Sequence, residues 1–244
     1  IGMWLTAEAE RLVVVVAVTL VMVVPFIVLT LRKTPASRPA LRPGPSLAAL
    51  ADRDFLIAFA SRLLVQTAVA LNVLYLLFFL DQETDARAAL SGIRIEVAVG
   101  GLLAVSTVLS VIAGLIGGRL SDRIGRRRVL VFAGAGLLAT GALIMGLVPS
   151  WPGPLVAQAI LGLGIGLYGI TDAVLVAEVL PNPENAGRDL GLLNVAVTAA
   201  QMLAPFVGLV ALTWLKVDLA SVYLIGALLA LLGGCSVLAI RRVG

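Results

Sequence analysis

Two residues of opposite charge, Arg62 and Asp172, lie inside apolar stretches of the 244-residue sequence. Each is about eight residues from one end of its stretch, which is roughly 12 Å along a helix. A charge inside a membrane span costs about 2.5–3.5 kcal/mol on insertion scales, and such residues usually face the bundle interior or a water-filled cavity. Equal depth and opposite charge therefore predict an ion pair at the edge of a polar passage, with Asp172 as the candidate proton carrier.

Polar side chains at helical spacing extend this candidate pathway. Gln66 follows Arg62 by four residues, so both lie on one helical face. Tyr168 precedes Asp172 by four residues in the same way, and a further polar stripe ends near Pro205, where a kink is predicted. Amides, an aromatic ring and a carboxylate suit a polar organic solute such as a sugar. The candidate pathway residues are Arg62, Gln66, Tyr168, Asp172, Asn194, Thr198 and Gln201.

A simpler interpretation of these residues stays open. Arg62 could extend its long stem to the cytoplasmic surface instead of pairing within the bundle. Asp172 could hydrogen-bond between helices, and Asn and Gln side chains commonly join helices inside membranes.

The elements that would position these residues are membrane helices. Hydrophobic residues make up 60% of the chain and charged residues 13%, and the mean hydropathy is +1.08. Apolar runs of about 20 residues fit helices that cross a bilayer, and the alternation of a β-barrel is missing. The fold class expected is an all-α polytopic membrane helix bundle of seven transmembrane helices, at 12–31, 54–80, 95–117, 129–148, 155–180, 190–213 and 219–240.

Residue usage argues against several chemistries. The chain has one cysteine, Cys235, and no histidine, so an internal disulfide and histidine-based catalysis or metal binding are excluded. Nucleophile, base and metal ligands do not converge anywhere, and no phosphate-binding loop with its lysine occurs. We therefore expect neither an enzyme, a metal site nor a cofactor. We interpret the excess of Lys and Arg over Asp and Glu as a signal of membrane topology, not of nucleic-acid binding.

Charge distribution predicts the orientation in the bilayer. Thirteen of the 18 Lys and Arg residues fall on one side, and Arg62 lies within a span. The other side holds only Arg11, Arg87, Arg94 and Lys216. The richer side is cytoplasmic by the positive-inside rule, which places the N-terminus of the chain outside and the C-terminus in the cytoplasm of a multi-pass plasma (inner) membrane protein. Residues 32–53 read as a basic, proline-rich cytoplasmic linker.

The connector "GGRLSDRIGRRRVL", residues 117–130, has a pattern that topology alone does not explain. Its G-x-L-x-D-x-x-G-R-R spacing resembles the signature loop of the major facilitator superfamily of secondary transporters. The glycines are expected to form a tight turn, and Asp122 to pair locally or cap a helix. In that family the loop joins helices 2 and 3 and again helices 8 and 9. With the loop placed between helices 8 and 9, the seven predicted spans match helix 6 and helices 7–12 of that family. Residues 32–53 then match its central linker.

A second segment, "AEVLPNPENAGRDLG" at 177–191, resembles the E-x-x-P...R-G segment of the same family, although Arg188 is not directly followed by glycine. The resemblance implies a cytoplasmic gate of charged residues. The alternative is a set of solvated loop charges worth under about 1 kcal/mol per pair. The gate residues implied are Gly118, Leu120, Asp122, Arg123, Gly125, Arg126, Arg127, Glu178 and Arg188.

The resemblance implies a domain order: 1–31 as the last helix of a truncated N-terminal half, 32–53 as the linker, and 54–244 as a six-helix transporter domain. The segment 187–205 is similar to sugar–cation symporters. The expected function is alternating-access transport of a small polar solute coupled to a proton or sodium ion, completed by N-terminal helices missing from this chain. The alternatives are a drug–proton antiporter and a seven-helix receptor.

Close helix packing is expected where small residues recur at four-residue spacing. Gly114 and Gly118 form one such pair, and Gly162 and Gly166 form another. This spacing lets two helix backbones approach closely in a membrane.

Overall fold

The computed structural model describes residues 51–180 and 186–241. These ranges contain helices and no strand. The helices are α2 (Arg53–Gln82), α3 (Ala86–Ala89), α4 (Ile95–Ile124), α5 (Arg127–Leu147), α6 (Gly153–Val179), α7 (Ala186–Leu209), the π-helix η3 (Val210–Trp214) and α8 (Leu219–Val237). The predicted span 12–31 and the linker up to residue 50 lie outside the described residues.

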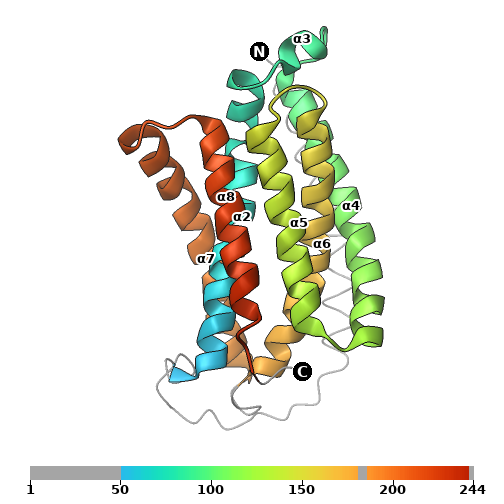
Figure 1. Ribbon diagram of the computed structural model, residues 1–244, viewed down its shortest axis with the longest axis vertical. Coiled ribbons are helices and arrows are strands. Elements are labelled where there is room, and N and C mark those ends of the chain that lie inside the picture. The colour runs from blue at the N-terminus through green and yellow to red at the C-terminus, as the bar shows by residue number, and fades with distance from the viewer. Residues whose placement is uncertain (1–50, 181–185, 242–244) are drawn as a thin grey trace, which may run out of the picture. The chain divides into compact units, whose positions relative to one another are not determined.

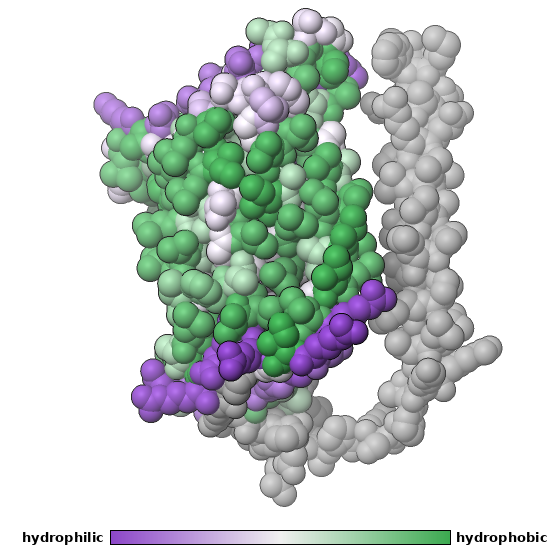
Figure 2. All heavy atoms as spheres, turned by 45° about the vertical axis from the view of Figure 1, so that its right-hand side comes forward, coloured by the Kyte–Doolittle hydropathy of each residue, from purple (hydrophilic) through white to green (hydrophobic). Residues whose placement is uncertain are grey.

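Six of these elements are long and apolar enough to cross a bilayer, with α7 and η3 counted as one span. They run upright beside one another, and successive contacts follow the order α4, α6, α5, α8, α2, α7 (Figure 1). Figure 2 shows a broad apolar belt with hydrophilic residues gathered at both ends. The all-α membrane bundle expected from the sequence is thereby confirmed for the six described spans.

The close packing predicted at the two glycine pairs is confirmed, and the structure shows that the helices carrying them, α4 and α6, pack against each other. Gly162 lies against the backbone of Ser106, and Gly166 lies against the backbone of Ser110 and Gly114. A side chain at either glycine would collide with the main chain of α4, which could yield only by moving the helix. The four-residue glycine spacing thus sets the distance between these two helices.

The third predicted span was wrong at its cytoplasmic end. We expected it to stop at Gly117, but α4 continues to Ile124. Its 30 residues make a rod of roughly 45 Å, longer than the bilayer core of about 30 Å, so the last turns carry charge beyond the apolar belt. Gly118 is therefore helical, and only Gly125, in the left-handed conformation at φ 67°, forms the turn into α5.

Helix α7 contains Pro205 in its interior and ends four residues later at Leu209, where the π-helix η3 begins. Proline lacks the N–H that would bond to the preceding turn, and neighbouring helices can supply the missing partner in a membrane bundle. The carbonyl that loses its donor is that of Gln201, four residues earlier. The Tyr75 hydroxyl donates instead to the carbonyl of Pro205 itself, at 3.4 Å, and so joins α2 to this turn of α7. Irregular helix geometry begins at Val210, five residues after the proline at which the sequence predicted a kink.

Asp218 caps the N-terminus of α8 by accepting hydrogen bonds from the hydroxyl and the backbone N–H of Ser221, at 2.6 and 2.8 Å. These bonds hold the pKa of Asp218 below its usual value. The cap is therefore fully present above the ordinary aspartate pKa and is lost as pH falls through the lowered pKa. We expect Asp218→Ala to cost about 1 kcal/mol at neutral pH and less in acid, measured by thermal unfolding in detergent. An equal loss at both pH values would contradict this assignment.

Candidate functional site

The two intramembrane charges meet inside the bundle. Arg62 Nε of α2 lies 3.1 Å from Asp172 Oδ2 of α6, and the two side chains are 15% and 4% exposed. The Nε–H makes no hydrogen bond among the described residues, so this contact is electrostatic rather than directed. The Tyr168 hydroxyl donates a long bond of 3.5 Å to Asp172 Oδ1. The pairing predicted from depth and charge is present, and both side chains are largely buried in the bundle.

The helices explain how this pair forms. Arg62 is nine residues from the start of α2 and Asp172 is seven from the end of α6, so both are roughly 10–14 Å from the same end of the bundle. Tyr168 is one turn from Asp172 on the same face of α6 and is buried. A single proton on Asp172 would remove the charged partner of a largely buried guanidinium, which is a large electrostatic change away from bulk water.

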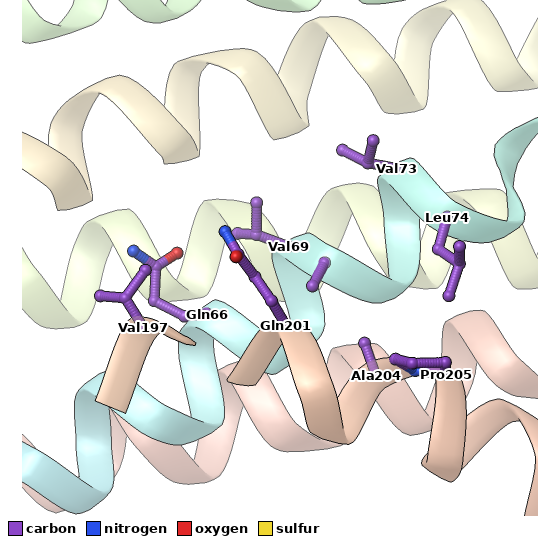
Figure 3. Close-up of a pocket in the computed structure, with 9 residues that line it drawn as sticks. Gln66, Val69, Val73, Leu74, Val197, Gln201, Ala204 and Pro205 are labelled. Atoms are coloured by element: carbon purple, nitrogen blue, oxygen red, sulfur yellow. The ribbon is translucent and has the colours of Figure 1, made fainter. Parts of the chain in front are cut away.

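A cavity of about 390 Å³ lies between α2 and α7, within the range of small-molecule sites. Gln66 from α2 and Gln201 from α7 direct their carboxamides into the same space (Figure 3). The rest of the wall is hydrocarbon: Val69, Ala70, Val73, Leu74, Val197, Ala204 and Pro205.

The structure divides the seven candidate pathway residues into three groups. Gln66 and Gln201 line the cavity, whereas Arg62, Tyr168 and Asp172 form the enclosed cluster beside it. Since Arg62 precedes Gln66 by one helical turn, the two groups are linked along α2. The remaining two, Asn194 and Thr198, are exposed on α7 and do not belong to the cavity wall, and the Thr198 hydroxyl donates to the Asn194 carbonyl at 3.5 Å.

A buried amide pair joins α2 to α6 farther along the bundle, toward the end opposite the Arg62–Asp172 pair. The sequence analysis did not identify this pair. Gln158 Nε2 of α6 donates to Asn72 Oδ1 of α2 at 2.8 Å, and Asn72 Nδ2 donates back at 3.5 Å. Tyr223 of α8 donates to the Asn72 carbonyl at 3.3 Å. The signal was available, because both residues are polar interruptions in apolar runs, like Arg62 and Asp172.

We expect Asn72→Leu to destabilise the bundle by about 1–3 kcal/mol, because it leaves the buried Gln158 amide without a partner. Replacing both residues with leucine removes the orphaned group and should cost less than the sum of the two single variants. Thermal unfolding in detergent of the two single variants and the double variant measures this coupling. Strictly additive losses would show that the amides do not act as a pair.

The cytoplasmic charges form fewer ion pairs than a single cluster would require. Arg127 pairs with Glu178, joining α5 to α6, and Arg188 lies 3.5 Å from Asp189 at the start of α7. Asp122 was expected to pair locally or cap a helix, and this was wrong. It lies in the last turns of α4, exposed, with no ion-pair partner in the described part of the chain.

Helix geometry explains this correction. Because α4 remains helical to Ile124, Asp122 projects from the helix surface instead of entering a compact turn. Four further motif residues are exposed, whereas a Cβ added at Gly118 would lie 3.6 Å from the Ile170 side chain. The exposed ones are Leu120, Arg123, Gly125 and Arg126. Among the described residues, no group of three or more acidic or thiol side chains could hold a metal ion.

Comparison with known proteins gives a consistent picture. A family model described as Major Facilitator Superfamily matches residues 93–243. A probable 4-methylmuconolactone transporter of Cupriavidus pinatubonensis is 34% identical over 50% of this chain and 28% of that protein. The human proton myo-inositol cotransporter is 33% identical over 43% of this chain and 16% of its own length.

Among solved structures, a crystal structure of the peptide transporter POT in complex with sulfate superposes with a TM-score of 0.65 at 18% identity. The superposition covers 78% of this chain and 38% of that one, so it supports the fold alone. The matched parts of these relatives are well under half of their lengths.

Proposed function

The chain belongs to the major facilitator superfamily, and we propose that it forms the C-terminal portion of a secondary transporter that moves a sugar- or polyol-like solute together with protons. It is a multi-pass membrane protein of a family of carriers. On this proposal 1–31 supply the last helix of an N-terminal half, 32–53 the linker and 54–244 the C-terminal half, with the C-terminus in the cytoplasm.

The observation that carries this proposal is the placement of a buried ion pair one helical turn from a cavity wall. Arg62 contacts Asp172 on one side and shares its helical face with Gln66 on the other. Protonation of Asp172 would release the guanidinium, and release of Arg62 would alter α2 at the level where the solute binds. Solute binding and proton binding would therefore influence each other through one helix, as energetic coupling requires.

The cytoplasmic charges fit this proposal as a gate. The Arg127–Glu178 pair joins α5 to α6 at the end where α6 also carries Asp172. The exposed Asp122, Arg123 and Arg126 would be available to an N-terminal half of the transporter when the cytoplasmic side closes. The name of one relative, the human proton myo-inositol cotransporter, supports both the solute class and the coupling ion.

The test is transport by the complete polypeptide that contains this chain, purified into liposomes. Labelled myo-inositol, sorbitol and glucose would be offered under an imposed pH gradient, acid outside. We expect at least one of them to accumulate above its external concentration and to leave when a protonophore collapses the gradient. Uptake that only equilibrates, unaffected by the gradient, would refute proton coupling.

A further inference from the structure

The cavity between α2 and α7 has two chemically different ends. Gln66 is 13 residues into α2 and Gln201 is 15 residues into α7, so their carboxamides lie at nearly the same level. Val73 and Leu74 follow Gln66 by about two turns, and Pro205 follows Gln201 by about one. The two helices run in the same direction (Figure 1). Val73, Leu74 and Pro205 therefore all lie on the C-terminal side of the two carboxamides and form a separate hydrocarbon end of the cavity.

Hydrogen bonding in this half of the site is therefore confined to one edge. Each carboxamide offers one acceptor oxygen and one NH₂ group. The hydrocarbon end offers no side-chain partner, and none of the described lining residues is charged. A solute hydroxyl turned toward Val73 and Leu74 would lose its water without replacement, a loss equivalent to about tenfold in affinity.

We propose that this cavity selects a neutral solute with oxygen groups on one edge and a methyl or methylene group on the opposite edge, in preference to a fully hydroxylated polyol. This rests on the proposed transport function and narrows its substrate class. The oxygen edge binds Gln66 and Gln201, and the hydrocarbon edge packs against Val73, Leu74 and Pro205. A charged solute is disfavoured because the wall supplies no counter-charge.

Val73 is the residue that tests this assignment most sharply. The residue lies in the cavity wall, is 55% exposed and belongs to none of the buried core clusters. Val73→Thr changes one methyl group into a hydroxyl at nearly constant shape, which supplies a hydrogen-bond partner at the hydrocarbon end. Val195→Thr on α7 makes the same change at a residue of similar exposure, 52%, outside the lining.

The experiment measures exchange of labelled solute across liposomes that contain the complete polypeptide, with no ion gradient. The probes are myo-inositol and its mono-O-methyl ethers. For the wild type we expect the best methyl ether to reach half-maximal exchange at about tenfold lower concentration than myo-inositol. Val73→Thr should reduce this preference at least threefold, whereas Val195→Thr should leave it within twofold.

The outcomes separate this inference from the proposal beneath it. Exchange of myo-inositol at lower concentrations than every methyl ether overturns the inference and leaves the transport function intact. An equal loss of preference in Val73→Thr and Val195→Thr also overturns it, because the effect would not come from the cavity. If neither probe exchanges, both the inference and the proposed polyol class are refuted.

Discussion

Asp172→Asn is expected to abolish accumulation of solute against its gradient while exchange of labelled for unlabelled solute continues. An asparagine cannot take up and release a proton, so movement of the solute would lose its link to the pH gradient. Exchange requires only that the solute-loaded carrier alternate between its outward-facing and inward-facing states, so exchange should continue. The measurement compares gradient-driven uptake with exchange in liposomes that contain the complete polypeptide.

Two further variants guard this prediction against misfolding. Asp172→Asn leaves the Arg62 guanidinium buried without its counter-charge, which costs about 3–5 kcal/mol in comparable cases. Neutralising both residues, as Arg62→Gln with Asp172→Asn, should recover stability without recovering accumulation. Glu96→Gln, at an exposed acid in the first turn of α4, should behave like the wild type. Undiminished accumulation by Asp172→Asn would refute its role as proton carrier.

Gly166→Ala is expected to produce the largest loss of folded protein among single substitutions in α6. The added Cβ would lie 2.7 Å from the Ser110 carbonyl carbon and 2.9 Å from the Gly114 nitrogen, both in the backbone of α4. Backbone atoms cannot rotate away as a side chain can, so α4 and α6 must separate. Overpacking costs about 1–3 kcal/mol where side chains can adjust, and we expect the upper end or more here.

Gly169→Ala is the matched control, because it adds the same methyl group to the same helix. Its Cβ would meet nothing within 4 Å. Recovery of monodisperse protein and the thermal midpoint in detergent should fall sharply for Gly166→Ala and stay near the wild type for Gly169→Ala. Equal behaviour of the two variants would show that the α4–α6 contact is not set by Gly166.

Much of the fold follows from apolar run length. The six described spans appear where runs of about 20 hydrophobic residues predicted them, because a helix is the cheapest way to bury backbone polar groups in lipid. The end of α4 could not be predicted in this way. Charged residues such as Arg119 and Arg123 end the apolar run but do not end the helix. Helix α4 ends only at Gly125, its left-handed C-cap.

The candidate site was predictable as far as helical faces determine it. Arg62 and Asp172 pair because a charge in an apolar run needs a partner at its own depth. The cavity wall depends on how α2 and α7 are rotated against each other, which the spacing of one helix does not contain. For this reason Gln201 lines the cavity, whereas Asn194 and Thr198, from the same polar stripe, do not.

Solute-driven proton movement is the most direct test of the link between the buried ion pair and transport. Liposomes that contain the complete polypeptide, without any gradient and with a pH-sensitive dye outside, would receive a transported polyol. Coupling through Asp172 predicts that the outside becomes alkaline in proportion to solute taken up, and that the Asp172→Asn protein gives no such change. Solute entry without proton movement in the wild type, or proton movement that persists in Asp172→Asn, would contradict the account.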